Sequence, residues 1–90
     1  MGINTSAGEL VKINVAAVTI TAPPDSSGAQ AEASARATEA AQRQIMPGFI
    51  AAFRPDSYRP GVLTGKFGVM NNADSSDYAV DTFSRVIAVN

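Results

Sequence analysis

The chain contains no cysteine, no histidine and no tryptophan. Without thiols and imidazoles it cannot form disulfide bonds, a zinc site of the usual ligands, a cysteine nucleophile or a Ser-His-Asp triad. Charged residues are also few, at 17%, and seven basic and eight acidic side chains leave a net charge of −1. Surfaces that bind nucleic acid are normally basic. The sequence therefore predicts no enzymatic activity, no cofactor, no metal and no nucleic-acid partner.

Large apolar side chains are scarce. Leu, Ile, Val and Phe together number 20 of 90 residues, just above the level of roughly one fifth below which disorder is expected. No apolar run is long enough to span a bilayer, so we expect no membrane partner. A chain of this length forms one small domain, which we place at residues 9–90 after a flexible N-terminal arm at residues 1–8. Burial against another chain would offset the thin core.

Residues 10–21 carry apolar, β-branched side chains at every second position, which predicts a β-strand. The alternation slips by one residue at Ala16-Ala17. We therefore expect either a β-bulge that returns the apolar set to one face, or burial on both faces at that point. Lys12 is the only charged residue of the strand after Leu10, so its edge would be poorly protected against pairing with another chain. The first β-branched apolar residues of this predicted strand are Val11, Ile13 and Val15.

Residues 29–46 are rich in strong helix formers and predict one long helix. Ser27 and Gln30 have the spacing of a capping box at its start. Two Glu–Arg pairs spaced four residues apart would support it, Glu32–Arg36 and Glu39–Arg43. One stripe of the helix is small and apolar, which suits close packing on a sheet; it consists of Ala33, Ala37, Ala41 and Ile45.

Pro47-Gly48 should end or kink this helix. Because Phe49, Ala52 and Phe53 continue at helical spacing, we expect a short second helix over residues 48–53. Phe49, Ile50 and Phe53 form the densest apolar cluster in the chain. They are interpreted as core residues or, alternatively, as a patch that faces a partner.

The remaining residues predict a turn-rich loop at 54–61, a strand at 62–70 and a polar connection at 71–77. Residues 78–89 have apolar residues at helical spacing, but their β-branched residues favour a strand. The predicted fold is a small single α+β domain, β–α–(short α)–β–β, with one long Ala-rich helix packed on a small antiparallel sheet.

Two groups of charged residues are candidate sites. Arg54 and Arg59 flank Tyr58 and could hold a carboxylate or phosphate in a fork, or pair with Asp56 and with helix-ending carbonyl groups. The second group consists of Asp74, Asp77 and Asp81. Its carboxylates could bind a hard cation, but the segment lacks the calcium-loop pattern. A solvated loop is therefore the better interpretation.

The strand edge points to a protein partner. A sheet of at most three strands would have two exposed edges, and strand addition by another chain would satisfy their backbone groups. We therefore expect a non-enzymatic structural or assembly protein, a homo-oligomer or a subunit of a larger complex such as a virion. Its partner-binding residues would be Phe49, Ile50, Phe53, Val11, Ile13 and Val15. The alternative is a small ligand-binding domain that holds an anionic group at Arg54 and Arg59.

Overall fold

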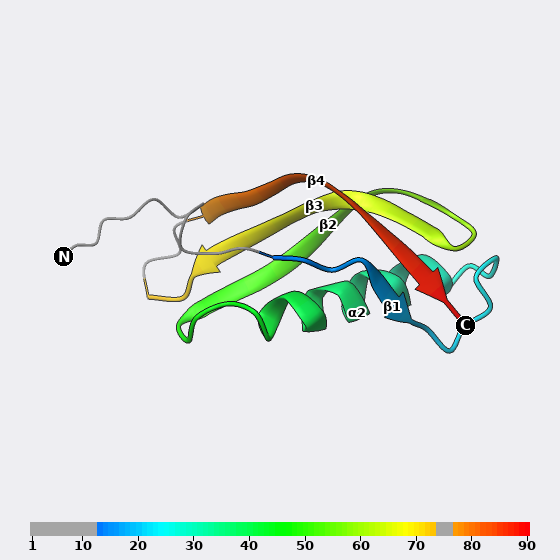
Figure 1. The fold of residues 1–90 in the computed structure, drawn as a ribbon, viewed down its shortest axis with the longest axis horizontal. Coiled ribbons are helices and arrows are strands. Elements are labelled where there is room, and N and C mark those ends of the chain that lie inside the picture. The colour runs from blue at the N-terminus through cyan, green and yellow to red at the C-terminus, as the bar shows by residue number, and fades with distance from the viewer. Residues whose placement is uncertain (1–12, 74–76) are drawn as a thin grey trace.

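One helix and a curled four-stranded sheet make up the described part of the chain (Figure 1). The computed structural model describes residues 13–73 and 77–90, and the side chains of 13–73 and 83–90. The elements in chain order are β1 (Ala17–Thr19), α2 (Ala29–Gln42), β2 (Phe49–Arg59), β3 (Val62–Asn71) and β4 (Asp77–Val89). The spatial order of the strands is β1-β4-β3-β2. The predicted α+β domain is thus confirmed in outline, while its order of elements is only partly right.

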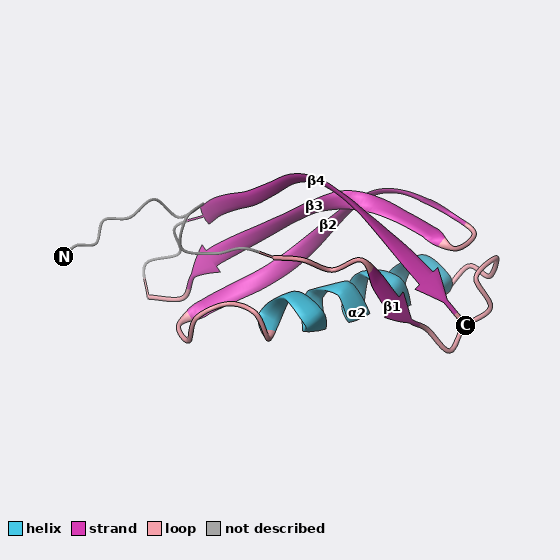
Figure 2. Cartoon of the chain, in the orientation of Figure 1, coloured by secondary structure: helices cyan, strands magenta, loops and turns pink. Residues whose placement is uncertain are grey.

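The sheet is mixed, not antiparallel as predicted. β2, β3 and β4 form an antiparallel meander, and β1 then pairs with β4 in parallel. A parallel neighbour requires a crossover connection. Here the crossover runs from β1 through α2, β2 and β3 to β4, which lets the first and last strands of the chain meet (Figure 2).

The first strand shows the predicted change of phase. Ile13 and Val15 are buried, Ala16 and Ala17 are both exposed, and burial then resumes at Val18. The slip therefore returns the apolar set to one face, and burial on both faces at Ala16-Ala17 is wrong. The paired ladder is short, covering Ala17–Thr19, and residues 10–12 of the predicted strand lie outside the described part of the chain.

The helix packs through small side chains. Four alanines one turn apart have no solvent exposure: Ala29, Ala33, Ala37 and Ala41. Because these side chains are short, the helix backbone lies close to the sheet, although each alanine buries little apolar area. Ile45, beyond the end of the helix, is partly buried against the same core.

The ends and ion pairs of the helix differ from the prediction. The N-cap is Gly28, with no capping side chain, so the expected capping box does not form. Arg36 pairs with Glu32 at 3.8 Å, as expected, and with Glu39 at 3.2 Å. The expected Glu39–Arg43 pair is absent among the described ion pairs, because Glu39 turns back toward Arg36.

The predicted short helix at 48–53 is wrong, and so is most of the predicted loop at 54–61. Both segments belong to the 11-residue strand β2. Gly48 takes a φ of +93°, a conformation that suits glycine and turns the chain from the helix into the strand. Phe49 and Phe53 fit a helical spacing, but they are also four residues apart on one face of a strand. Pairing with β3 over the whole length of β2 decides between the two.

The last two strands agree with the sequence. The predicted strand at 62–70 is confirmed as β3, and the ambiguous segment at 78–89 is a strand, β4. The ladder between them shifts register on both sides of Phe67. Such irregularities increase local twist, which is consistent with the curl of the sheet around the helix (Figure 1).

The core fills the space between the helix and the concave face of the sheet. The rings of Phe53 and Phe67 meet edge to face, with centroids 4.7 Å apart and planes inclined at 67°. Leu63 and Val86 are fully buried beside them. The opposite face of the sheet is not covered by the helix, and Ile50, Phe83 and Val89 are exposed there at 42%, 60% and 46%.

Candidate functional site: the free edge of β1

The outermost strands of the sheet are β1 and β2, and helix α2 contacts both. β1 pairs with β4 only at Ile87–Val89, so the rest of β4 has no neighbour from β1. This arrangement decides which backbone groups another chain can reach. An uncovered edge presents unpaired N–H and C=O groups that can template an added strand.

The edge of β2 is covered by helix side chains. Gln42 donates from Nε2 to the Phe49 carbonyl at 3.0 Å, and its Oε1 accepts from the Ala51 N–H at 2.9 Å. The Phe53 N–H donates to Thr38 Oγ1 at 3.1 Å. The next outward position is Pro55, which has no N–H to leave unpaired. From Phe49 to Pro55 this edge is therefore a poor template for an added strand, contrary to the expectation of two exposed edges.

The segment that contains β1 is held by hydrogen bonds from the helix side only before and after the strand. On the N-terminal side, Gln44 accepts from the Asn14 N–H at 3.0 Å and donates to the Asn14 carbonyl at 3.3 Å. On the C-terminal side, Glu32 accepts from the N–H groups of Thr21 and Ala22 at 2.8 and 2.9 Å. The backbone between these two anchors has no such cover from the helix.

The Glu32 carboxylate is stabilised in its charged form by this arrangement. Hydrogen bonds from the backbone N–H groups of Thr21 and Ala22 lower its pKa from the ordinary value of 4.5, and the Thr21 hydroxyl and Arg36 add to this effect. A carboxylate that accepts backbone N–H bonds holds its proton less readily. Glu32 thus binds the backbone that follows β1 most strongly when its carboxylate is ionised.

Lowering the pH is expected to weaken the hydrogen bonds between Glu32 and the backbone that follows β1. Since the folded-state pKa is lowered, the contribution of Glu32 to stability is complete above the unfolded-state pKa and is lost as the pH falls through the folded-state value. The melting temperatures of wild type and Glu32→Gln, measured from pH 7 to pH 3, should therefore converge. Glu39→Gln, which loses an ion pair but no bond to the backbone, serves as the control. A wild-type advantage over Glu32→Gln that stayed constant across this range would contradict the assignment.

Between the anchors, every second residue of β1 turns its backbone away from the sheet. The Ile20 N–H donates to the Val89 carbonyl at 2.8 Å, and the Ala16 carbonyl accepts from the Ile87 N–H at 3.0 Å. The backbone N–H and C=O groups of the even-numbered residues in the segment 16–20 therefore face β4. Because direction alternates along a strand, the N–H and C=O groups of Ala17 and Thr19 point to the free edge.

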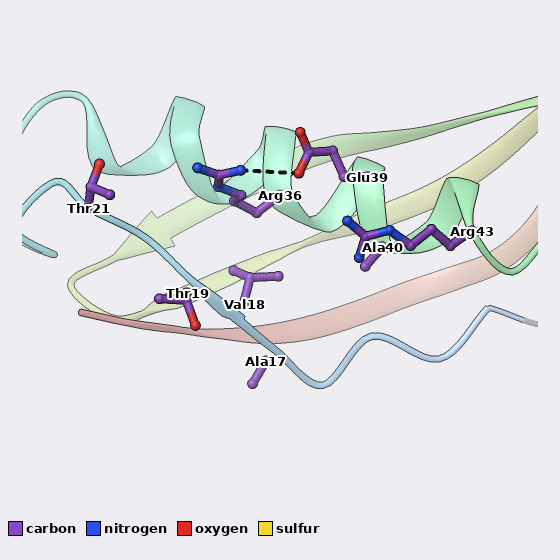
Figure 3. A pocket seen from close by; sticks show the side chains of 8 residues that line it. All are labelled: Ala17, Val18, Thr19, Thr21, Arg36, Glu39, Ala40 and Arg43. Atoms are coloured by element: carbon purple, nitrogen blue, oxygen red, sulfur yellow. Dashed lines mark hydrogen bonds and ion pairs between the residues drawn. The ribbon is translucent and has the colours of Figure 1, made fainter.

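A groove of about 400 Å³ runs beside this edge (Figure 3). β1 forms one wall, and the helix side chains of Arg36, Glu39, Ala40 and Arg43 form the other. Ala40 is small and leaves room between the two arginines, one turn to either side of it. Val18 points toward the helix, whereas Ala17 and Thr19 point away from it (Figure 3).

The predicted apolar patch does not exist as one surface. Because 49–53 is a strand, neighbouring residues alternate between its two faces. Phe53 is buried and Phe49 partly buried against the core, while Ile50 lies on the opposite face. The interpretation as core thus holds for Phe53, and the geometry does not bring Ile50 together with it.

The partner-binding residues predicted on the first strand also lie in the core where the structure describes them. Ile13 and Val15 are each 9% exposed and belong to the core, so their side chains are not available to a partner. Val11 and the predicted arm at residues 1–8 lie outside the described residues. What the edge offers is backbone, at Ala17 and Thr19, which an analysis of side-chain types does not single out.

Arg54 and Arg59 do not converge. The Arg54 guanidinium lies over Gly68, with Nη1 2.8 Å from the position that a Cβ atom would take there. Gly68 pairs with Ala52, so Arg54 is directed toward the start of β2, while Arg59 stands at its end. The fork predicted from their spacing is therefore not formed by these two residues.

The described part of the chain contains neither a cluster of metal-ligating side chains nor a helix that could span a membrane. There, no group of three or more acidic side chains is arranged to hold a metal ion. The predicted acidic loop falls outside this statement, because Asp74 and the side chains of Asp77 and Asp81 are among those not described. No helix of the described segments is both long and apolar enough to cross a membrane.

Comparison of the chain with protein-family models, with curated proteins and with solved structures found no match.

Proposed function

We propose that this chain is a non-enzymatic structural protein that assembles with other subunits by strand addition at the edge of β1. One observation carries the proposal: among the described residues, side chains of the helix and of Gln44 bond to the edge of β2 from Phe49 to Phe53 and to the residues that flank β1, but leave Ala17–Thr19 open beside a groove. Strand addition supplies affinity through backbone hydrogen bonds. It therefore needs no special side chains, which suits a sequence without a recognisable motif.

The expected partner is a second copy. Ala17 and Thr19 are placed symmetrically about Val18, so two β1 strands can pair antiparallel around a twofold axis with Ala17 opposite Thr19 of the partner copy. Each such pair exchanges two backbone hydrogen bonds, and the same patch serves both copies, as in most symmetric dimers. The two sheets would then join into one. The same edge would serve a subunit of a larger assembly, a virion among them.

Thr19→Pro is expected to abolish this association while leaving the domain folded. Proline lacks the N–H that would bond to the partner, and it is tolerated at an edge-strand position whose N–H faces outward. Thr19→Val is the matched control, because it keeps the backbone N–H and the β-branched shape. Sedimentation velocity from about 5 to 500 μM, with circular dichroism to verify folding, should show association for wild type and Thr19→Val only.

A wild-type chain that stayed monomeric over this concentration range would contradict pairing with a second copy. Equal association of a folded Thr19→Pro variant would show that another surface is used. In either case the proposed pairing of two β1 edges would be wrong.

A further inference from the structure

A second hollow, of about 270 Å³, lies on the face of the sheet that the helix does not cover. It is formed by side chains from the three strands of the meander: Ser57, Arg59, Val62, Thr64 and Arg85. The hollow is separate from the β1 groove and shares no lining residue with it. Its lining contains two cationic and two hydroxyl side chains and no acid.

The strand register explains how these residues meet. Arg59 pairs with Val62, and Thr64 pairs with Arg85 on the other side of β3. The register shift between Pro55 and Ser57 brings Ser57 opposite Thr64. The two arginines thus lie on the strands on either side of β3, with Thr64 directly between Ser57 and Arg85, and with Arg59 in the neighbouring row.

The hydroxyl groups are held in place. Ser57 Oγ and Thr64 Oγ1 lie 2.8 Å apart, and Thr64 Oγ1 also donates to the Ser57 carbonyl at 3.4 Å. A hydroxyl group can both donate and accept. If Thr64 gives up its long bond to the Ser57 carbonyl and donates to Ser57 Oγ instead, the Ser57 hydroxyl proton is free to point into the hollow while the contact between the two hydroxyl groups is kept.

The charge of the hollow is not compensated within the described structure. There, both ion pairs are formed on the helix by Arg36, and no described carboxylate pairs with Arg59 or Arg85. Two like charges facing one site repel each other, and an anion between them would remove this repulsion. Arginine suits such a site, because its planar fork binds phosphate or carboxylate oxygens in pairs.

We propose that this hollow binds a phosphate group, held between the guanidinium groups of Arg59 and Arg85 with the Ser57–Thr64 hydroxyl pair as an additional donor. A dianion matches the two guanidinium charges, and a tetrahedral group offers oxygens to both strands at once. A single carboxylate carries half that charge. The chemistry is shared by free phosphate and by a phosphate monoester on another molecule.

The test is a titration of ¹⁵N-labelled protein at constant ionic strength, followed through the Nε–H resonances of the arginines. Inorganic phosphate, phosphoserine and acetate are the three ligands. We expect saturable shifts at Arg59 and Arg85 with phosphate, and at least about tenfold weaker binding of acetate. Tighter binding of phosphoserine than of inorganic phosphate would assign the site to phosphorylated partners, and the reverse order to free phosphate.

Arg59→Gln and Arg85→Gln should each weaken phosphate binding by about tenfold or more. Arg54→Gln is the matched control, because Arg54 lies on the same face and strand but is directed toward Gly68. The proposal is overturned if wild type shows no saturable shift up to about 50 mM phosphate, or if all three variants lose binding equally. Because β1 is not involved, this result is independent of the association experiment.

Discussion

Replacing Gly65 by alanine is expected to lower the free energy of unfolding by about 3 kcal/mol. An added Cβ would collide with the Arg54 carbonyl and would lie 2.7 and 2.8 Å from two ring carbons of Phe53. The carbonyl belongs to the paired strand β2 and cannot move without breaking the ladder. Phe53 cannot turn away either, because its ring is packed against Phe67.

Urea denaturation measures this effect, and Gly28→Ala is the matched control. Gly28 precedes the helix with a φ of −88°, and nothing lies within 4 Å of its Cβ position. We expect Gly28→Ala to change stability by less than about 1 kcal/mol. If the two alanine variants had equal stability, the close approach of β2 and β3 at Gly65 would be wrong.

Replacing Phe53 by alanine is expected to cost about 3 to 5 kcal/mol. The side chain is 6% exposed and lies between the helix and the sheet. Removing the ring leaves a cavity beside Phe67 that the surrounding strands cannot close. In a domain of 90 residues with few large apolar side chains, this loss is a large part of the total stability.

Ile50→Ala is the control for this variant. Ile50 is 42% exposed on the opposite face of β2, and we expect a cost below about 1 kcal/mol. The unfolding midpoints of both variants should be measured together with their sedimentation. A Phe53→Ala variant that was stable but had lost its association would restore the interpretation of Phe53 as a partner contact.

Several elements could be predicted from the sequence because local patterns are sufficient for them. The alanine-rich helix is specified by its composition, and its buried stripe follows from the spacing of four residues between alanines. The strand at 62–70 follows from its apolar residues, and the strand at 78–89 from its β-branched ones. The slip at Ala16-Ala17 is also visible in the sequence, since Val15 and Val18 share a face only if the phase changes.

Other features depend on residues far apart in the chain. The spacing of Phe49 and Phe53 satisfies both a helix and a strand, and only pairing with β3 selects the strand. The parallel pairing of β1 with β4 joins the two ends of the chain across the whole fold. Neither has a local signal, because the hydrogen bonds that decide them are made between segments that are distant in sequence.

The same holds for the candidate sites. From the sequence alone follow one long helix, several strands, a thin core and the lack of cysteine and histidine side chains. The tertiary structure decided which edge is covered and which stays open, because Thr38, Gln42, Gln44 and Glu32 reach the edge strands only when the helix lies across the curled sheet. It also set Arg59 beside Arg85 and directed Arg54 elsewhere, since register and side-chain direction arise only when strands pair.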